Sequence, residues 1–208
     1  ILQLQSLNLN SAPEVSIKNS MIYNHAFFGI FGFMGKIRAE NTLVYNCGKN
    51  IVGLYDGGQY EFLNCTFYAR SSAYVSHSKE PAFFFNDYFK VSQTAYVAAD
   101  AADAVFENCI LYGTLEEEII KDDILENPMP VNLTFTNCVV KTKEALSAPV
   151  FISSIGNDPQ FKDVFKNNFN LKSTSPCRGF STAHFPSSDI DGFTRTGSVT
   201  DCGAYIFQ

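Results

Sequence analysis

One asparagine recurs along this chain at a nearly constant interval. The gaps between successive members are 22, 23, 22, 22 and 29 residues. Each member stands in a similar local frame, of which residues 62–67 (Phe-Leu-Asn-Cys-Thr-Phe) are an example. A fixed period of this length indicates a repeat architecture. The six members are Asn19, Asn41, Asn64, Asn86, Asn108 and Asn137.

Apolar and polar residues alternate before each asparagine. The residues two positions earlier are apolar, and polar residues flank most of them, as in a strand with one buried face. A second short strand recurs about ten residues after the asparagine, for example at Ile51 and Val52. Short strands repeating in this way predict a parallel β-helix with rungs about 4.8 Å apart. The apolar positions are Ile17, Ala39, Phe62, Phe84, Phe106 and Phe135.

An inward asparagine ladder with aromatic stacks extends over residues 15–140. In this respect the chain resembles the pectate-lyase-like right-handed parallel β-helix superfamily. The resemblance implies an all-β, single-stranded right-handed parallel β-helix over residues 1–155, with about 22 residues per rung and about seven rungs. It specifies no activity, because this scaffold carries lyases, hydrolases and adhesins.

Residues 156–208 depart from the repeat. Their order of motifs is similar to the C-terminal region of cell-surface β-helix proteins of polysaccharide-using bacteria, which implies a secreted or cell-surface protein. We expect this segment to form a C-terminal cap packed on the last rung, because an uncovered rung exposes unpaired backbone. Cys177 and Cys202 both lie in the cap, and we predict a disulfide between them. The motifs are Asn157-Asp158-Pro159-Gln160-Phe161, Leu171 to Pro176, Asp189-Ile190-Asp191-Gly192 and Asp201-Cys202-Gly203-Ala204-Tyr205.

A column of aromatic and basic residues follows the ladder, four positions after each repeating asparagine. Alternation turns this column toward solvent, where aromatic faces suit sugar rings and lysines suit acidic sugars. Stacking that only stabilises neighbouring rungs is the alternative. The predicted ligand-binding residues are Tyr23, Tyr45, Tyr68, Lys90, Tyr112 and Lys141.

Carboxylates crowd the long insertion at residues 113–130. Such a cluster can bind Ca²⁺, although a solvated charged surface is the plainer interpretation, and no other cofactor is indicated. Asp189 and Asp191 resemble part of a calcium loop but lack its later ligands, which favours an Asx turn. The insertion contains Glu116, Glu117, Glu118, Asp122, Asp123 and Glu126.

No motif assigns a catalytic residue. The Gly-His-Gly element of a pectin hydrolase is absent from the sequence, while Lys36, Arg38 and Arg70 are possible bases for an eliminating lyase. His25 and Cys47 fall at equivalent positions of neighbouring rungs, yet nothing marks the third group that a nucleophilic pair requires. The cysteines that follow the ladder asparagines, Cys65, Cys109 and Cys138, are predicted to be buried thiols.

Composition restricts the partners. The net charge of −6 with scattered basic residues argues against nucleic acid, and no apolar run has the roughly 20 residues of a membrane helix. The sequence starts at Ile1, which fits a processed protein and equally a trimmed one, and an upstream domain is possible. We expect a module that binds or scaffolds a polysaccharide without catalysis. The alternatives are a polysaccharide lyase or a fragment of one, and a structural or adhesive protein.

Overall fold

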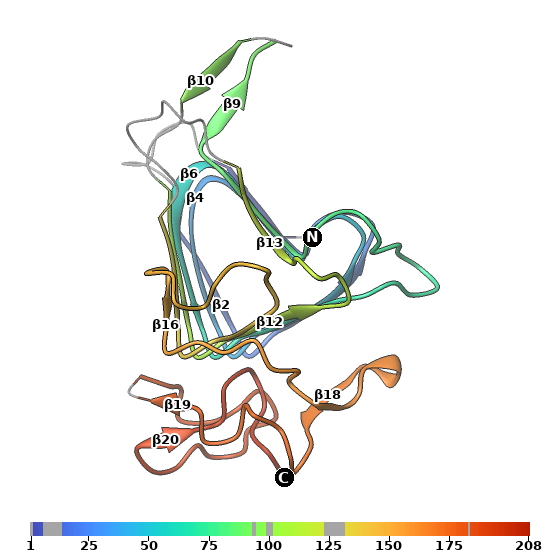
Figure 1. The fold of residues 1–208 in the computed structure, drawn as a ribbon, viewed down its shortest axis with the longest axis vertical. Helices are drawn as coiled ribbons and strands as arrows, with labels where there is room; N and C mark the ends of the chain where they lie inside the picture. Colours follow the sequence, from blue (N-terminus) through green and yellow to red (C-terminus); the bar gives the residue numbers. More distant parts are fainter. Residues whose placement is uncertain (1, 6–13, 93–94, 99–101, 123–131, 183) are drawn as a thin grey trace.

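The structure is a computed structural model that describes residues 2–5, 14–92, 95–98, 102–122, 132–182 and 184–208. Parallel strands wind around one apolar core, and successive turns superpose when viewed along the coil (Figure 1). The coil has three flat faces, so its cross-section is a rough triangle. The prediction of a parallel β-helix is therefore confirmed.

Each face is a ladder of parallel strands. Two long strands, β4 and β6, turn a corner and join the first and second faces into one sheet. Positive φ angles at Met34 in β4 and at Asp56 and Gly57 in β6 make that corner. The first face contains β1 (Leu2–Gln5), the start of β4 (Ile30–Glu40), the start of β6 (Val52–Leu63), β8 (Phe83–Asn86) and β13 (Ile119–Asp122).

The second face carries the strands that lead into the asparagine corner, and the third face follows that corner. The second face contains β2 (Glu14–Lys18), the ends of β4 and β6, β11 (Ala102–Glu107), β14 (Asn132–Thr136) and β16 (Phe151–Ile152). The third face contains β3 (Met21–His25), β5 (Leu43–Cys47), β7 (Thr66–Ala69), β12 (Ile110–Gly113) and β15 (Val139–Val140). A hairpin of β9 (Tyr88–Lys90) and β10 (Tyr96–Ala98) projects from the coil (Figure 1).

A stack of phenylalanines fills the core beneath the second face. The ring centroids of Phe62 and Phe106 lie 4.6 Å apart, those of Phe106 and Phe135 5.1 Å, and those of Phe135 and Phe151 5.3 Å. All four rings are buried. Because parallel rungs in register place equivalent side chains above one another, the repeat in the sequence becomes this stack.

Five of the six asparagines form the ladder. Asn19, Asn41, Asn64, Asn108 and Asn137 have φ angles of 46–56°, the left-handed conformation that asparagine tolerates. The Nδ2 group of Asn41 donates to Oδ1 of Asn19 at 3.1 Å, and that of Asn108 donates to Oδ1 of Asn64 at 3.4 Å. This bonding explains the polar residue at a buried corner.

Asn86 is the exception, and its predicted place in the ladder is wrong. Residues 102–107 of β11 pair directly with residues 58–63 of β6, so Asn108 follows Asn64 after a single turn. Asn86 ends β8 on the first face, and Phe84 points outward there, with its ring 5.2 Å from that of Tyr55. The second face thus has six stacked strands in the described chain, where about seven rungs were expected.

The C-terminal segment does not cap the last rung as predicted. Leu146, Ala148 and Val150 pack against the coil core at that end. The segment that follows lies along the outside of the third face (Figure 1). It contains β17 (Phe161–Asp163), the 3-10 helix η2 (Val164–Lys166), β18 (Asn168–Leu171), β19 (Ser181–Thr182) and β20 (Val199–Thr200).

The outward side chains of the third face explain this position. Leu43, Ile110 and Val139 point away from the coil core and are buried against the tail, together with Phe169 and Leu171. An apolar outer face needs a cover, and the tail supplies it. Among the described residues, no helix has the length and apolar character to cross a membrane.

Candidate functional site

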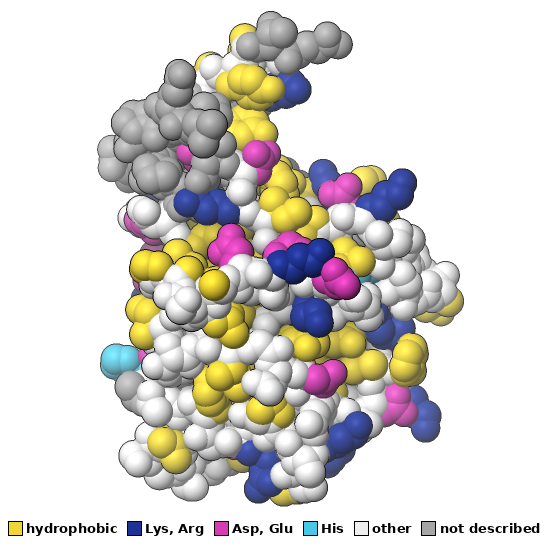
Figure 2. Space-filling model, viewed as in Figure 1, with side chains coloured by type: hydrophobic (Ala, Val, Ile, Leu, Met, Phe, Trp, Pro, Cys, Tyr) yellow, Lys and Arg dark blue, Asp and Glu magenta, His cyan; other side chains and the backbone are white. Residues whose placement is uncertain are grey.

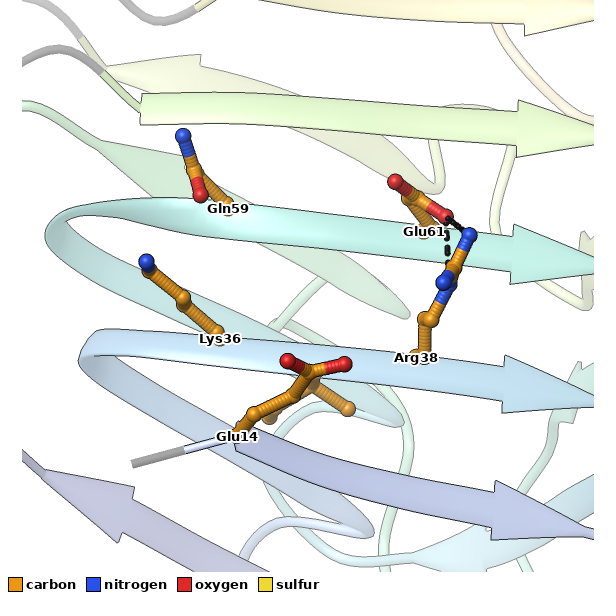
Figure 3. Close-up of a pocket in the computed structure, with 6 residues that line it drawn as sticks. Glu14, Lys36, Arg38, Gln59 and Glu61 are labelled. Carbon is orange, nitrogen blue, oxygen red and sulfur yellow. Dashed lines mark hydrogen bonds and ion pairs between the residues drawn. The ribbon is translucent and has the colours of Figure 1, made fainter. Parts of the chain in front are cut away.

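The outer surface of β2, β4 and β6 presents rows of polar side chains. Alternation sends Ile37 inward and leaves Lys36 and Arg38 on the outside of the second face. The register places Glu14 beside Lys36, and Lys36 beside Gln59. Figure 3 shows these side chains standing on the same side of the sheet.

Two neighbouring hollows lie on this surface, with volumes of about 220 Å³ and about 440 Å³. We call them together the polar face. The smaller is lined by Glu14, Lys36, Ile37, Arg38, Gln59 and Glu61. The larger is lined by Glu14, Ser16, Lys18, Arg38, Ala39, Glu40, Glu61 and Leu63.

Ion pairs cross the rungs of the polar face. The Arg38 guanidinium contacts the Glu61 carboxylate at 2.7 Å, and both side chains are more than half exposed. Lys18 contacts Glu40 at 3.1 Å. Lys36 has no ion-pair partner among the described residues. The surface therefore offers donors and acceptors at the spacing of the rungs, and the Lys36 ammonium group, which forms no ion pair with any residue that the structure describes.

Opposite charges are interspersed elsewhere as well. On the face that Figure 2 shows, Lys and Arg alternate with Asp and Glu, and they form no extended basic patch.

The tyrosine column exists, but most of it does not face solvent. Tyr45 and Tyr112 are each only 8% exposed, whereas Tyr23, at the open end of the column, is 51% exposed. The ring of Phe169 lies 5.0 Å from that of Tyr45 and 5.5 Å from that of Tyr68. The expectation that the column is open is thus wrong, because the tail occupies the place expected for a sugar.

The two lysines of the predicted column are separated. Lys141 does continue it, with Nζ 5.4 Å from the centre of the Tyr112 ring. Lys90 belongs to β9 of the projecting hairpin, where its Nζ lies 5.4 Å from the Tyr96 ring. Lys90 lies outside the column for the same reason as Asn86, because β11 pairs directly with β6 and the segment between them forms no separate rung.

The described carboxylates of the acidic insertion at residues 113–130 each contact a different part of the structure. Glu118 is fully buried, and its carboxylate lies 3.0 Å from Nε2 of the buried His77. The same carboxylate accepts the backbone N–H of Ala82 at 2.9 Å and that of Leu115 at 2.8 Å. It anchors two loops rather than facing solvent.

The other carboxylates of the insertion have separate partners. Glu116 contacts Lys143 at 2.8 Å, and Glu117 accepts the backbone N–H of the same lysine. Asp122 accepts the Tyr88 hydroxyl at 2.6 Å, which raises the pKa of Tyr88 to about 12. Asp123 and Glu126 lie outside the described residues.

Calcium binding is the alternative interpretation of the acidic insertion and of Asp189 with Asp191, and the contacts of the described residues do not favour it. No group of three or more His, Cys, Asp or Glu side chains with metal-binding geometry occurs in the described parts of the chain. Asp189 accepts the backbone N–H groups of Asp191 and Phe193, at 3.0 Å and 2.9 Å. This is the bonding of an Asx turn, so that interpretation is confirmed.

The six cysteines are free thiols in the structure, and all are buried. Cys65, Cys109 and Cys138 are fully buried below the ladder, as predicted. Cys177 and Cys202 are adjacent, since the backbone N–H of Cys202 donates to the carbonyl of Cys177 at 2.9 Å. Their disulfide stays a prediction.

His25 and Cys47 are paired across neighbouring rungs, as their spacing predicts. Burial raises the pKa of the Cys47 thiol to about 11, which opposes formation of a nucleophilic thiolate. Of the possible lyase bases, Arg70 contacts the tail, where its Nε donates to the carbonyl of Val164 at 3.1 Å. Lys36 and Arg38 both lie on the polar face.

Sequence reasoning singled out Lys36 and Arg38 but missed the face that they share. The available signal was opposite charge at equivalent rung positions, as for Arg38 and Glu61, which lie 23 residues apart. The cover over the tyrosines also had a signal. Residues 43–45 and 110–112 are apolar without alternation, as in strands that are buried on both faces.

Comparison with known proteins gave a likeness to a solved structure. No protein-family model matches the sequence, and no curated protein matches it. Among solved structures, the crystal structure of pectate lyase Pel9A is similar over 93% of this chain, with 13% identity and a TM-score of 0.43. This chain covers 59% of the length of that one. Similarity at this level carries no conclusion about activity.

Proposed function

We propose that this chain is a β-helix module that binds a polysaccharide along the polar face, without chemistry of its own. The observation that carries the proposal is the row of outward polar side chains across β2, β4 and β6, with its two hollows. Strands repeat at about 4.8 Å, so a hydroxyl-rich polymer lying across them meets donors and acceptors at regular intervals. The secreted or cell-surface location stays a prediction.

The charges of the polar face favour exchangeable contacts. An exposed ion pair such as Arg38 with Glu61 contributes only about 0.2–1 kcal/mol. A sugar hydroxyl or carboxylate can therefore replace one partner at small cost. Lys36 is available to an acidic sugar, because its ammonium group has no ion-pair partner among the described residues.

Binding should be measured against a panel of neutral and acidic polysaccharides. We expect Lys36→Ala and Arg38→Ala each to weaken binding by about two- to fivefold, because one exposed charged contact contributes at most about 1 kcal/mol. Lys162→Ala is the matched control, because that exposed lysine lies on the tail strand β17. If no polysaccharide is retained, or if both polar-face variants bind as tightly as the control, the proposal is wrong.

A polysaccharide lyase is the second candidate, and the Lys36 ammonium group beside the hollow, which has no ion-pair partner in the described part of the chain, favours it. Elimination requires a base at the substrate, a role that lysine can perform when it is deprotonated. Incubation with acidic polysaccharides, followed by the ultraviolet absorbance of unsaturated products, separates the two functions. Unsaturated products that form with the parent chain and are absent with Lys36→Ala would show that the chain is a lyase and not a binding module without catalysis.

A further inference from the structure

Another hollow lies where the tail meets the third face of the coil. Its volume is about 420 Å³, within the range of about 300–1,000 Å³ that small-molecule sites occupy. One wall comes from β7 of the coil, and the other walls come from the tail around β17, η2 and β18. We call it the tail hollow. It is lined by Tyr68, Asp158, Gln160, Phe161, Val164 and Lys172.

Three polar groups of the tail hollow are available to a ligand. The Tyr68 hydroxyl forms no hydrogen bond with any residue that the structure describes. Asp158 and Lys172 carry opposite charges, and neither has an ion-pair partner in the described part of the chain. One oxygen of Asp158 accepts the backbone N–H of Gln160 at 2.7 Å. Burial, and then the Asp158 carboxylate, raise the pKa of Tyr68, so the carboxylate and the phenol act on each other.

The remaining wall of the tail hollow is apolar. Phe161 is buried, with its ring edge-on to that of Tyr68 at 5.6 Å, and Val164 is partly buried. A sugar ring suits such a lining, because its C–H groups pack on apolar surface while its hydroxyls both donate and accept hydrogen bonds. The charges of Asp158 and Lys172 balance each other, so the hollow favours an uncharged ring over an acidic one.

Hydrogen bonds hold the shape of the tail hollow. The backbone N–H of Lys172 donates to the carbonyl of Gln160 at 3.0 Å. Nε of Arg70 donates to the carbonyl of Val164 at 3.1 Å, which ties η2 to the coil. Oδ1 of Asp163 accepts two backbone N–H groups of η2, at 3.1 Å and 3.2 Å. Walls that are already ordered lose little conformational freedom when a ligand enters, which favours binding.

We propose that the tail hollow binds one neutral sugar ring. The ring packs against Phe161 and Val164. One of its hydroxyls accepts a hydrogen bond from Tyr68, another donates to the Asp158 carboxylate, and the Lys172 ammonium group donates to a third oxygen. No residue lines both the tail hollow and the polar face, so the proposal does not depend on binding at the polar face.

Saturation-transfer difference NMR with the methyl glycosides of glucose, galactose and mannose tests the proposal. We expect at least one of them to bind with a dissociation constant of about 1–10 mM, and glucuronate to bind more weakly than methyl glucoside. Tyr68→Phe keeps the ring and removes only the hydroxyl, so it should weaken binding by about two- to tenfold, the range for one hydrogen bond. Asp158→Asn should weaken binding by about tenfold, because hydrogen bonds to a charged acceptor are stronger.

Tyr45→Phe is the matched control for Tyr68→Phe. Tyr45 stands one rung away in the same column, but Phe169 covers it and it does not line the tail hollow. Tyr45→Phe, and Lys36→Ala on the polar face, should each leave the dissociation constant within about twofold of the parent value. Circular dichroism of both tyrosine variants should match the parent, because neither hydroxyl has a hydrogen-bond partner among the described residues.

Several results would overturn the proposal. The first is that none of the three glycosides binds. The second is that Tyr68→Phe binds as tightly as Tyr45→Phe. Glucuronate that binds more tightly than the neutral glycosides would mean a site for acidic sugars instead. Binding that is weakened by Lys36→Ala and not by Tyr68→Phe would place the sugar on the polar face, and would leave only the proposed function standing. If Asp158→Asn fails to fold, Tyr68→Phe still decides the question.

Discussion

Substituting Phe106 and Phe84 separately by alanine tests the register of the coil. Both residues stand two positions before a repeating asparagine, so a uniform repeat gives them equal roles. Phe106 is fully buried, between Phe62 at 4.6 Å and Phe135 at 5.1 Å. Phe84 lies on the outer surface, partly exposed, with its ring 5.2 Å from that of Tyr55.

The two substitutions should differ in cost. Removing a buried phenylalanine costs about 3–5 kcal/mol, and stacking on both sides places Phe106→Ala near the upper value. Phe84→Ala removes a ring that is already partly in solvent and has one ring contact, with Tyr55, so we place its cost at about 1–2 kcal/mol. The expected difference of about 3 kcal/mol corresponds to about 6–12 °C in melting temperature for a chain of this size.

Urea denaturation followed by circular dichroism measures both free energies of unfolding. An unchanged dependence on urea concentration is required, because a change in slope would mean that the unfolding reaction itself has changed. Equal losses in the two variants would refute the register in which Asn108 follows Asn64 directly. Equal losses would indicate instead that Asn86 belongs to a rung of its own between Asn64 and Asn108.

Three further predictions concern buried charge. Burial, and then the neighbouring Asp87, raise the pKa of Asp56 from 3.8 to about 6. Because the pKa of this carboxyl is higher in the folded state, the free energy of unfolding falls as the pH rises from about 4 to about 6. Asp56→Asn should therefore flatten the fall in urea midpoints between about pH 4 and pH 7. Parallel pH curves for the parent and the variant would contradict this prediction. Arg195 is buried and donates to two carbonyls within the tail, at 2.7 Å and 2.8 Å. Arg195→Ala should cost about 2–4 kcal/mol and speed protease cleavage of the tail at least tenfold, whereas unchanged cleavage would mean that these bonds do not hold the tail in its fold. Glu118→Ala should cost about 3–5 kcal/mol by leaving His77 without its buried partner, and its urea midpoint should recover in part with His77→Ala, while additive losses would mean that the two are uncoupled.

The ladder and the phenylalanine stack could be predicted because a parallel coil repeats the same environment at each turn. Position in the period then decides burial, as it does for Phe62, Phe106 and Phe135. The failure at Asn86 has a specific cause. The turn from Asn64 to Asn108 is 44 residues long, which equals two ordinary periods. An excursion of that length is indistinguishable from an added rung when only spacing is read.

The position of the tail was missed for a different reason. Alternation correctly predicted that Tyr45 and Tyr112 point away from the coil core, but pointing outward was equated with exposure. The outer side of a sheet can itself be an interior surface when another segment of the chain covers it. The polar face was missed because its residues come from separate rungs, and single positions such as Glu14 or Glu61 carry no motif.

The tail also changes how the coil holds together. A repetitive coil interacts mainly between nearest neighbours, so its rungs can melt one by one. Four ladder asparagines, each in a different rung, donate from their Nδ2 groups to atoms of the tail. They are Asn41, Asn64, Asn108 and Asn137. The tail therefore links these rungs along the axis of the coil, so that they unfold together. The order of the chain also means that the ribosome completes the rungs before the tail, so the apolar outer side of the third face is still uncovered during that interval.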